Sequence, residues 1–232
     1  MQIFYAPDIT SQLELPETEA RHCTQVLRLK EGDSITITDG KGYFYEATIT
    51  MATRKKCRVQ INKTSEVQKL YRNNLHIAMA PTKRMERIEW WAEKATEIGI
   101  DTISFLNTQY SERRAINLDR IDKKVISATK QSLKAHIPLV NPIMDFNDFI
   151  NLSFEGQKFI AHCYSTPKKL LKNILLPKKD TLILIGPEGD FSEEEVELAV
   201  ENGFTPITMG EARLRTETAA LVAVHSFAII NQ

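Results

Sequence analysis

The sequence predicts an α/β protein in which a small N-terminal β-barrel precedes a larger domain built on a parallel sheet. Residues 34–50 alternate in polarity around a glycine-containing turn, as a β-hairpin does. From Leu75 onward, short apolar strands alternate with amphipathic helical segments, which is typical of a parallel α/β sheet. An apolar run at 181–185 stops at a glycine turn, as a buried strand does.

The composition is that of a soluble globular protein: the 232-residue chain is 42% hydrophobic and 26% charged. Its start lacks the basic and apolar regions of a signal peptide. No apolar run approaches the roughly 20 residues that span a bilayer. The cysteines Cys23, Cys57 and Cys163 lie far apart and form no C-x-x-C pair. We therefore expect a cytoplasmic protein with no membrane association, no metal site and no disulfide framework.

Charge is distributed unevenly along the chain, although the formal net charge is zero. Residues 1–137 hold 22 Lys and Arg against 17 Asp and Glu, a net charge of +5, and residues 138–232 hold 8 against 13, a net charge of −5. A basic part of this kind is suited to a polyanion such as RNA. Two ordinary solvated surfaces would produce the same asymmetry.

We expect the first domain to cover residues 1–70. Strands are predicted at 34–38, 43–50 and 57–61, with a turn at 39–42. A single helix is predicted at 16–29, with Pro16 in its first turn. Residues 66–74 are polar and read as a linker to a second domain at 71–232.

In the second domain, strands are predicted at 75–79, 102–106 and 158–161, and helices at 84–98, 118–135 and 167–175. Gly99 is placed to end the helix at 84–98 with a left-handed residue. After the strand at 181–185, Ser192 and Glu195 have the spacing of a capping box. That helix should end at Asn202 and Gly203. A strand at 205–208 and a last helix from Thr216, its expected cap, to about residue 230 complete the chain.

Two glycine turns carry the main functional signal. Gly186–Gly189 and Gly210 each follow a strand, so we expect adjacent strand ends to bring both turns together and their backbone groups to hold an adenine edge and a ribose. The sequence lacks a Walker A loop and the G-x-G-x-x-G pattern. Glu188 and Asp190 would repel a pyrophosphate, whereas S-adenosylmethionine has no phosphate and carries a positive sulfonium. The alternative is a pair of plain tight turns.

Basic side chains form a second signal. Arg213 and Arg215 would share one face of an extended segment and could hold a phosphate or a base edge, unless Glu211 and Glu217 neutralise them. Further candidates for phosphate contacts with RNA are spread over both domains, although a solvated surface also explains each one. Histidines 76, 136, 162 and 225 lie in or beside apolar segments, and we expect the buried ones to have hydrogen-bond partners. The RNA-binding candidates are Arg21, His22, Arg28, Lys83, Arg113, Arg114 and Lys134.

Several of these strings together resemble the bacterial 16S ribosomal RNA uracil-N3 methyltransferases, which belong to the SPOUT class of knotted methyltransferases. The resemblance covers nearly the whole chain in order. It rests on residues 185–189 (IGPEG) and 214–219 (LRTETA), on Arg21-His22 with 26–28 (VLR), on 94–99 (KATEIG), on 111–113 (SER), and on Gln131-Ser132 with Pro138.

The resemblance implies a PUA-like barrel, a trefoil-knotted α/β domain, a homodimer and S-adenosylmethionine as cofactor. For the reaction itself, our candidates are Arg215, near O2 or O4 of the uracil, and Glu217, as proton acceptor or ribose holder. The sequence departs from the family pattern at Asp190, where glycine is usual, at Ala212-Arg213 and at Lys134. The implied cofactor-binding residues are Ile185, Gly186, Pro187, Glu188, Gly189, Met209, Gly210, Leu214, Thr218 and Ala219.

The expected function is methylation of uridine N3 in 16S ribosomal RNA or the small ribosomal subunit. A knotted methyltransferase with another RNA target, such as a ribose 2′-hydroxyl, is one alternative. A non-catalytic RNA-binding or ribosome-assembly factor with a degenerate cofactor pocket is another, and the departures at Asp190 and Ala212 keep it open. A nucleotide-dependent α/β enzyme is disfavoured by the missing phosphate loop. The modified nucleotide cannot be named from the sequence.

Overall fold

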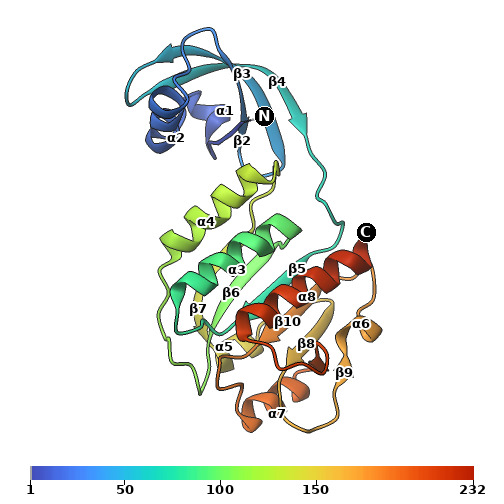
Figure 1. The fold of residues 1–232 in the computed structure, drawn as a ribbon. Helices are drawn as coiled ribbons and strands as arrows, with labels where there is room; N and C mark the ends of the chain where they lie inside the picture. The colour runs from blue at the N-terminus through green and yellow to red at the C-terminus, as the bar shows by residue number, and fades with distance from the viewer. Residues whose placement is uncertain (1) are drawn as a thin grey trace. The chain divides into compact units, whose positions relative to one another are not determined.

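The computed structural model describes residues 2–232, which divide into two units (Figure 1). Met1–Lys69 and Ile126–Ile137 form the first unit, and Leu70–Val125 and Pro138–Gln232 form the second. The first unit is therefore discontinuous in sequence. Helix α4 (Leu118–Gln131) begins in the second unit and ends in the first.

The first unit is built on a four-stranded sheet in the order β1-β2-β3-β4. Strand β1 (Ile3–Tyr5) runs parallel to β2 (Ser34–Thr38), while β3 (Tyr43–Ala52) and β4 (Cys57–Glu66) continue the sheet antiparallel. The predicted hairpin is confirmed. Its alternating residues Ile35, Ile37, Ala47 and Ile49 are buried, which explains the period of two seen in the sequence.

The helix predicted at 16–29 is shorter and less regular in the structure. After a short helix α1 (Ile9–Gln12), α2 covers Glu17–Arg21 and passes directly into a π-helical turn, η1 (His22–Val26). Pro16 is the N-cap instead of a first-turn residue, and Arg28 lies outside the helix with a positive φ of 58°. Arg21, His22 and Arg28, which all lie within the predicted helix, are therefore not carried by one regular helix.

Residues 126–137 complete the first unit through backbone contacts. The Gly42 N–H donates to the Ala135 carbonyl at 2.9 Å, and the Ile137 N–H donates to the Gly40 carbonyl at 2.9 Å. Gly42 has a φ of 108°, and a Cβ there would lie 2.6 Å from the ring of His136. A side chain at position 42 would therefore displace the segment that closes this unit.

The second unit is a seven-stranded parallel sheet in the order β7-β6-β5-β10-β8-β11-β9, as the α/β pattern predicted. The sequence did not predict β7 or the two-residue β9, which occupies part of the helix expected at 167–175. The strands are β5 (Leu75–Met79), β6 (Thr102–Asn107), β7 (Leu139–Asp145), β8 (Gln157–Ala161), β9 (Lys169–Leu170), β10 (Thr181–Ile185) and β11 (Thr205–Thr208).

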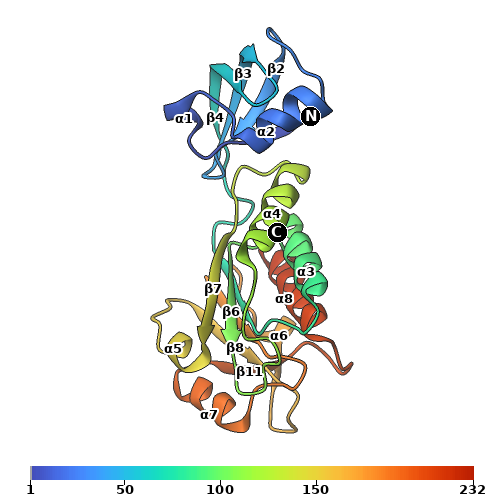
Figure 2. The ribbon, with the colours of Figure 1, turned by 90° about the vertical axis from the view of Figure 1, so that its left-hand side faces the viewer.

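Helices cover both faces of this sheet (Figure 2). Helices α3 (Met85–Ile98) and α8 (Thr216–Asn231) pack together on one face, where α8 also contacts β5 and β10. On the other face, α5 (Phe146–Ile150) and α7 (Glu193–Glu201) share an apolar cluster with Leu182 and Leu184 of β10. Helix α6 (Leu171–Ile174) contacts α8. Strand β10 is buried along its whole length, as its apolar run predicted.

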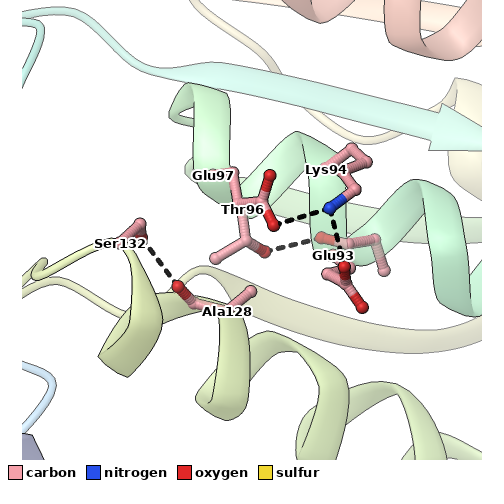
Figure 3. Close-up of polar contacts among 7 residues, drawn as sticks. Glu93, Lys94, Thr96, Glu97, Ala128 and Ser132 are labelled. Carbon is pink, nitrogen blue, oxygen red and sulfur yellow. Dashed lines mark hydrogen bonds and ion pairs between the residues drawn. The ribbon is translucent and has the colours of Figure 1, made fainter.

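The segment 94–99, part of the family resemblance, lies at the end of α3 (Figure 3). Lys94 Nζ donates to Glu93 Oε1 and Glu97 Oε1, both at 2.8 Å, and these bonds raise the pKa of Lys94. Gly99 ends the helix with a φ of 128°, as expected of a glycine cap. Near the end of α4, the Ser132 hydroxyl donates to the Ala128 carbonyl at 2.7 Å (Figure 3). These motif residues therefore stabilise helix ends.

None of the helices among residues 2–232 is long and apolar enough to cross a membrane. The same residues contain no group of three or more His, Cys, Asp or Glu side chains placed to hold a metal ion.

Candidate functional site

Three parallel strands end at the same level and define the candidate site. Ile185, the last residue of β10, is in register with Ala161 of β8, and Ala161 is in register with Ile207 of β11. The expectation that β10 and β11 are neighbours is wrong, because β8 lies between them. The loops after all three strands enclose a cavity of about 460 Å³, within the range of small-molecule sites.

The loop after β10 turns tightly beside the cavity. A Cβ on Gly186 would lie 3.0 Å from the backbone nitrogen of Phe191, so the turn leaves little room for a side chain. Asp190, where the family usually has glycine, adopts a left-handed φ of 69°. Its carboxylate accepts from the N–H of Phe191 at 2.8 Å and from that of Cys163 at 2.6 Å. The departure at Asp190 therefore preserves the turn and fastens it to the loop after β8.

The second carboxylate of this loop is also engaged. Glu188 Oε1 accepts from the backbone N–H of Lys83 at 3.1 Å. Arg113 holds the same stretch, because its guanidinium donates to the carbonyls of Thr82 at 3.1 Å and Lys83 at 2.6 Å. The expected acidic wall therefore lines the cavity and also joins the loops around it.

The start of α8 supplies the cationic side of the cavity. Arg215 is the N-cap residue, without a capping side-chain bond, and Thr216 is the first helical residue. The expected capping role of Thr216 is wrong. Arg213 and Arg215 are exposed and both line the cavity, as does the buried Thr216. Two arginines close together in sequence therefore line the cavity.

Glu217 lies in the first turn of α8 but does not line the cavity. It is only 6% exposed, and its Oε1 lies 3.4 Å from Nη1 of Arg87 on α3. Its second oxygen, Oε2, has no hydrogen-bond partner among the described residues. An unpaired buried carboxylate oxygen is costly, so a hydrogen-bond donor from a bound molecule would find favourable binding there.

The loop after β8 contributes two residues that the sequence reasoning missed as site residues. His162 and Cys163 both line the cavity. His162 is buried, and neither ring nitrogen has a hydrogen-bond partner among the described residues. The expectation that buried histidines are satisfied is therefore wrong for His162. It is correct for His76, whose Nε2 lies 2.8 Å from Ser104 Oγ, and for His136, whose Nε2 lies 2.8 Å from the Val67 carbonyl oxygen.

The predicted cofactor residues mostly meet at this cavity. Gly210 and Thr218 do not line it. The strand at 158–161 was predicted, but nothing in its sequence indicates that it lies between β10 and β11. Ala161, Ile207 and Thr208 were therefore not expected to line the cavity. The predicted residues that line the cavity are Ile185, Gly186, Pro187, Glu188, Gly189, Met209, Leu214, Arg215 and Ala219.

The predicted RNA-binding residues lie in both units. In the first unit, Arg21 forms an ion pair with Glu17, His22 contacts Gln2 through Nε2 at 2.9 Å, and Arg28 is exposed; Lys134 belongs to residues 126–137 of this unit. In the second unit, Lys83 pairs with Glu112 at 3.0 Å, Arg113 holds the loop at 82–83, and Arg114 is exposed. Each residue's role in RNA binding stays a prediction.

The cavity fits S-adenosylmethionine in size and chemistry. Its glycine-rich lining offers backbone groups to a nucleoside, its two carboxylates suit a sulfonium, and His162 presents two unused ring nitrogens. Residues 185–190, Met209, residues 212–214 and Ala219 would hold the molecule. When bound, it supplies an activated methyl group.

Comparisons with known proteins agree with this geometry. A family model described as an RNA methyltransferase domain matches residues 69–228, and one described as an RNA methyltransferase PUA domain matches residues 15–62. The chain is 30% identical to the ribosomal RNA small subunit methyltransferase E of Buchnera aphidicola subsp. Acyrthosiphon pisum, over 94% of this chain and 87% of that protein.

Two solved structures have the same fold over almost their whole length. A probable rRNA methyltransferase from Porphyromonas gingivalis is 42% identical, with a TM-score of 0.95 over 100% of this chain and 98% of the other. The ribosomal RNA small subunit methyltransferase E of Neisseria gonorrhoeae, bound to S-adenosylmethionine, is 29% identical, with a TM-score of 0.88 over 99% and 98%.

Proposed function

The chain belongs to the ribosomal RNA small subunit methyltransferase E family, and on that premise we propose that it transfers the methyl group of S-adenosylmethionine to N3 of a uridine in 16S ribosomal RNA. One observation supports this most directly. The cavity at the ends of β8, β10 and β11 is lined by the glycine turn at 186–189, by two carboxylates and by two arginines.

The reaction requires a base edge that is normally paired. The target uridine must be unpaired or flipped so that its N3 can reach the cavity. Arg215 lies at the N-terminus of α8, where the helix dipole adds to its positive charge. Its guanidinium would stabilise the negative charge that develops on O2 or O4 as the N3 proton leaves.

Glu217 is the proposed proton acceptor or ribose holder. Its unpaired Oε2 can take a hydrogen bond, while the Arg87 contact at Oε1 limits the motion of the side chain. For Glu217 to act, its carboxylate must reach the substrate from its position outside the cavity lining. We propose that RNA flanking the target is held through phosphate contacts by basic residues of both units, among them Arg28 and Arg114.

We also propose that the protein is a homodimer that works in the cytoplasm. Helix α8 is apolar on nearly all sides, and its Ile229 side chain is 55% exposed. A helix with apolar residues all round normally buries them, so a second copy packed on α8 would remove this surface from water. Light scattering of the purified protein should give a mass near twice the 26.5 kDa of the chain.

Nucleoside analysis tests the proposed reaction. Mass spectrometry of 16S ribosomal RNA from cells that lack the gene should show the loss of one 3-methyluridine, and the purified enzyme with S-adenosylmethionine should restore it. Assaying naked RNA and assembled subunits side by side would identify the substrate form. Loss of a ribose-methylated nucleotide would instead support a different RNA target, and an unchanged nucleoside profile would support a non-catalytic assembly factor.

A further inference from the structure

His162 is the most unusual polar side chain of the cavity. It is only 6% exposed, and both of its ring nitrogens lack hydrogen-bond partners among the described residues. Native proteins rarely leave a buried polar group unpaired, because the group loses its hydrogen bonds to water without replacement. His76 on β5 shows the ordinary arrangement, with a partner at Ser104. The position of His162 in the cavity lining indicates that its missing partner is a ligand.

The surroundings of His162 favour the neutral form of its imidazole. Burial and the nearby Lys168 lower the pKa of His162, against a smaller opposing effect from the Asp190 carboxylate. Lys168 Nζ is fixed beside the ring, because it donates to the carbonyls of His162, at 3.1 Å, and Tyr164. The Tyr164 ring packs against His162 with 5.7 Å between centroids.

A neutral imidazole offers one N–H donor and one lone pair. A carboxylate only accepts hydrogen bonds and an ammonium only donates them, so each of these groups can pair with just one of the two ring nitrogens. A ribose hydroxyl both donates and accepts, and an adenine edge presents a donor beside an acceptor. The chemistry of the nucleoside half of S-adenosylmethionine thus matches a neutral histidine better than that of its amino-acid half.

We propose that His162 binds the nucleoside half of the methyl donor through its ring nitrogens. The proposal rests on the proposed function of the cavity and adds a residue that the glycine turns alone do not provide. The position of β8 between β10 and β11 places the loop that carries His162 between the other two loops of the cavity.

Calorimetry with two ligands tests this. The first ligand is S-adenosylmethionine, and the second is 5′-methylthioadenosine, which keeps the nucleoside and lacks the amino-acid group. His162→Phe keeps the ring shape and removes both nitrogens, so it should weaken binding of both ligands by tenfold or more. His162→Gln, which retains a donor and an acceptor, should lose less.

Thermal unfolding without ligand separates a binding role from a structural one. Since the ring nitrogens of His162 have no partners within residues 2–232, His162→Phe should leave the Tm unchanged or raise it. The matched control is His76→Phe, which removes a satisfied nitrogen and should lower the Tm while leaving both affinities unchanged.

The outcomes are distinct. Unaltered affinities in His162→Phe would overturn the inference and leave the proposed function intact. Weaker binding of S-adenosylmethionine alone would assign His162 to the amino-acid half and would also overturn it. A wild-type protein that binds neither ligand would contradict the proposed function itself.

Discussion

Two hollows lie along the same edge of the parallel sheet, and they differ in chemistry more than in size. The cavity at the ends of β8, β10 and β11 has a volume of about 460 Å³. The second hollow, near the ends of β6 and β7 and the start of α7, has about 490 Å³. The first is lined by one glycine turn, two arginines and a histidine whose ring nitrogens have no partner among the described residues. The second is lined by Arg114 and by four carboxylates, those of Asp145, Asp148, Glu194 and Glu195.

The carboxylates of the second hollow mostly serve the fold. Glu195 Oε1 accepts from the N–H of Gln109 and Oε2 from the N–H of Ser192, both at 2.8 Å. Asp145 Oδ1 accepts from Asn107 Nδ2 at 2.6 Å, although Asn107 Oδ1, in a partly exposed residue, has no partner. Volume alone does not distinguish the two hollows. A hollow is the stronger candidate for a binding site when the polar groups that line it are free to bond to a ligand.

The strongest test of the difference between the two hollows removes Arg215, one of the two arginines that line the first cavity. Arg215→Ala should lower the rate of methyl transfer to ribosomal RNA by about 100- to 1000-fold, the usual cost of losing one group that stabilises an anion in the transition state. Affinity for S-adenosylmethionine should change little. Single-turnover methylation and calorimetry measure the two effects, and full transfer by the variant would contradict the role given to Arg215.

The same assays decide the role of Glu217. Glu217→Gln keeps the shape of the side chain and removes its charge. A slower transfer step would support proton acceptance, and weaker cofactor binding would support a ribose contact. If neither quantity changes, Glu217 acts only as the partner of Arg87.

A second test addresses how the cavity is held open. Asp190→Ala should lower the free energy of unfolding by about 2 kcal/mol, because alanine at a φ of 69° is strained and the bonds to Cys163 and Phe191 are lost. Asp190→Gly loses the same bonds without the strain, so it should be less destabilised. Urea unfolding measures both. Equal stability of the two variants would mean that the left-handed turn does not persist in solution.

The smallest effects are expected at the second hollow. Ser192→Ala removes the capping box of α7 and should cost about 1 kcal/mol of stability, while the affinity for S-adenosylmethionine stays within about twofold. Asp148→Asn, at an exposed position, should alter stability by less than about 0.5 kcal/mol and leave the affinity unchanged. A large loss of affinity in either variant would make the second hollow part of the site.

Local signals predicted much of the fold. The bounds of β10 and the capping box at Ser192 and Glu195 are as expected, because an apolar run and a capping pair act within a few residues. Strand β7 was missed because it pairs on one side only, contains Pro142 and has no buried residue. The helix at 16–29 was predicted too long because neither the π-helical turn nor the left-handed conformation of Arg28 has a recognisable pattern in the local sequence.

The site was predicted to the extent that its residues are close in sequence. The loops at 185–189 and 209–215 meet at the cavity as expected, but the position of β8 between their strands depends on strand order, which is not a local property. His162 was therefore assigned to the core. The trefoil knot also depends on the path of the whole chain and stays a prediction.

The discontinuity of the first unit constrains how the protein is made. Synthesis delivers residues 1–69 first, yet the N–H of Gly42 and the carbonyl of Gly40 find their partners at Ala135 and Ile137. The nascent N-terminal unit therefore cannot close until residue 137 of the 232 has emerged. A fragment ending at Lys69 would expose this unfinished edge, so a gene cut at that point should yield a poorly folded product.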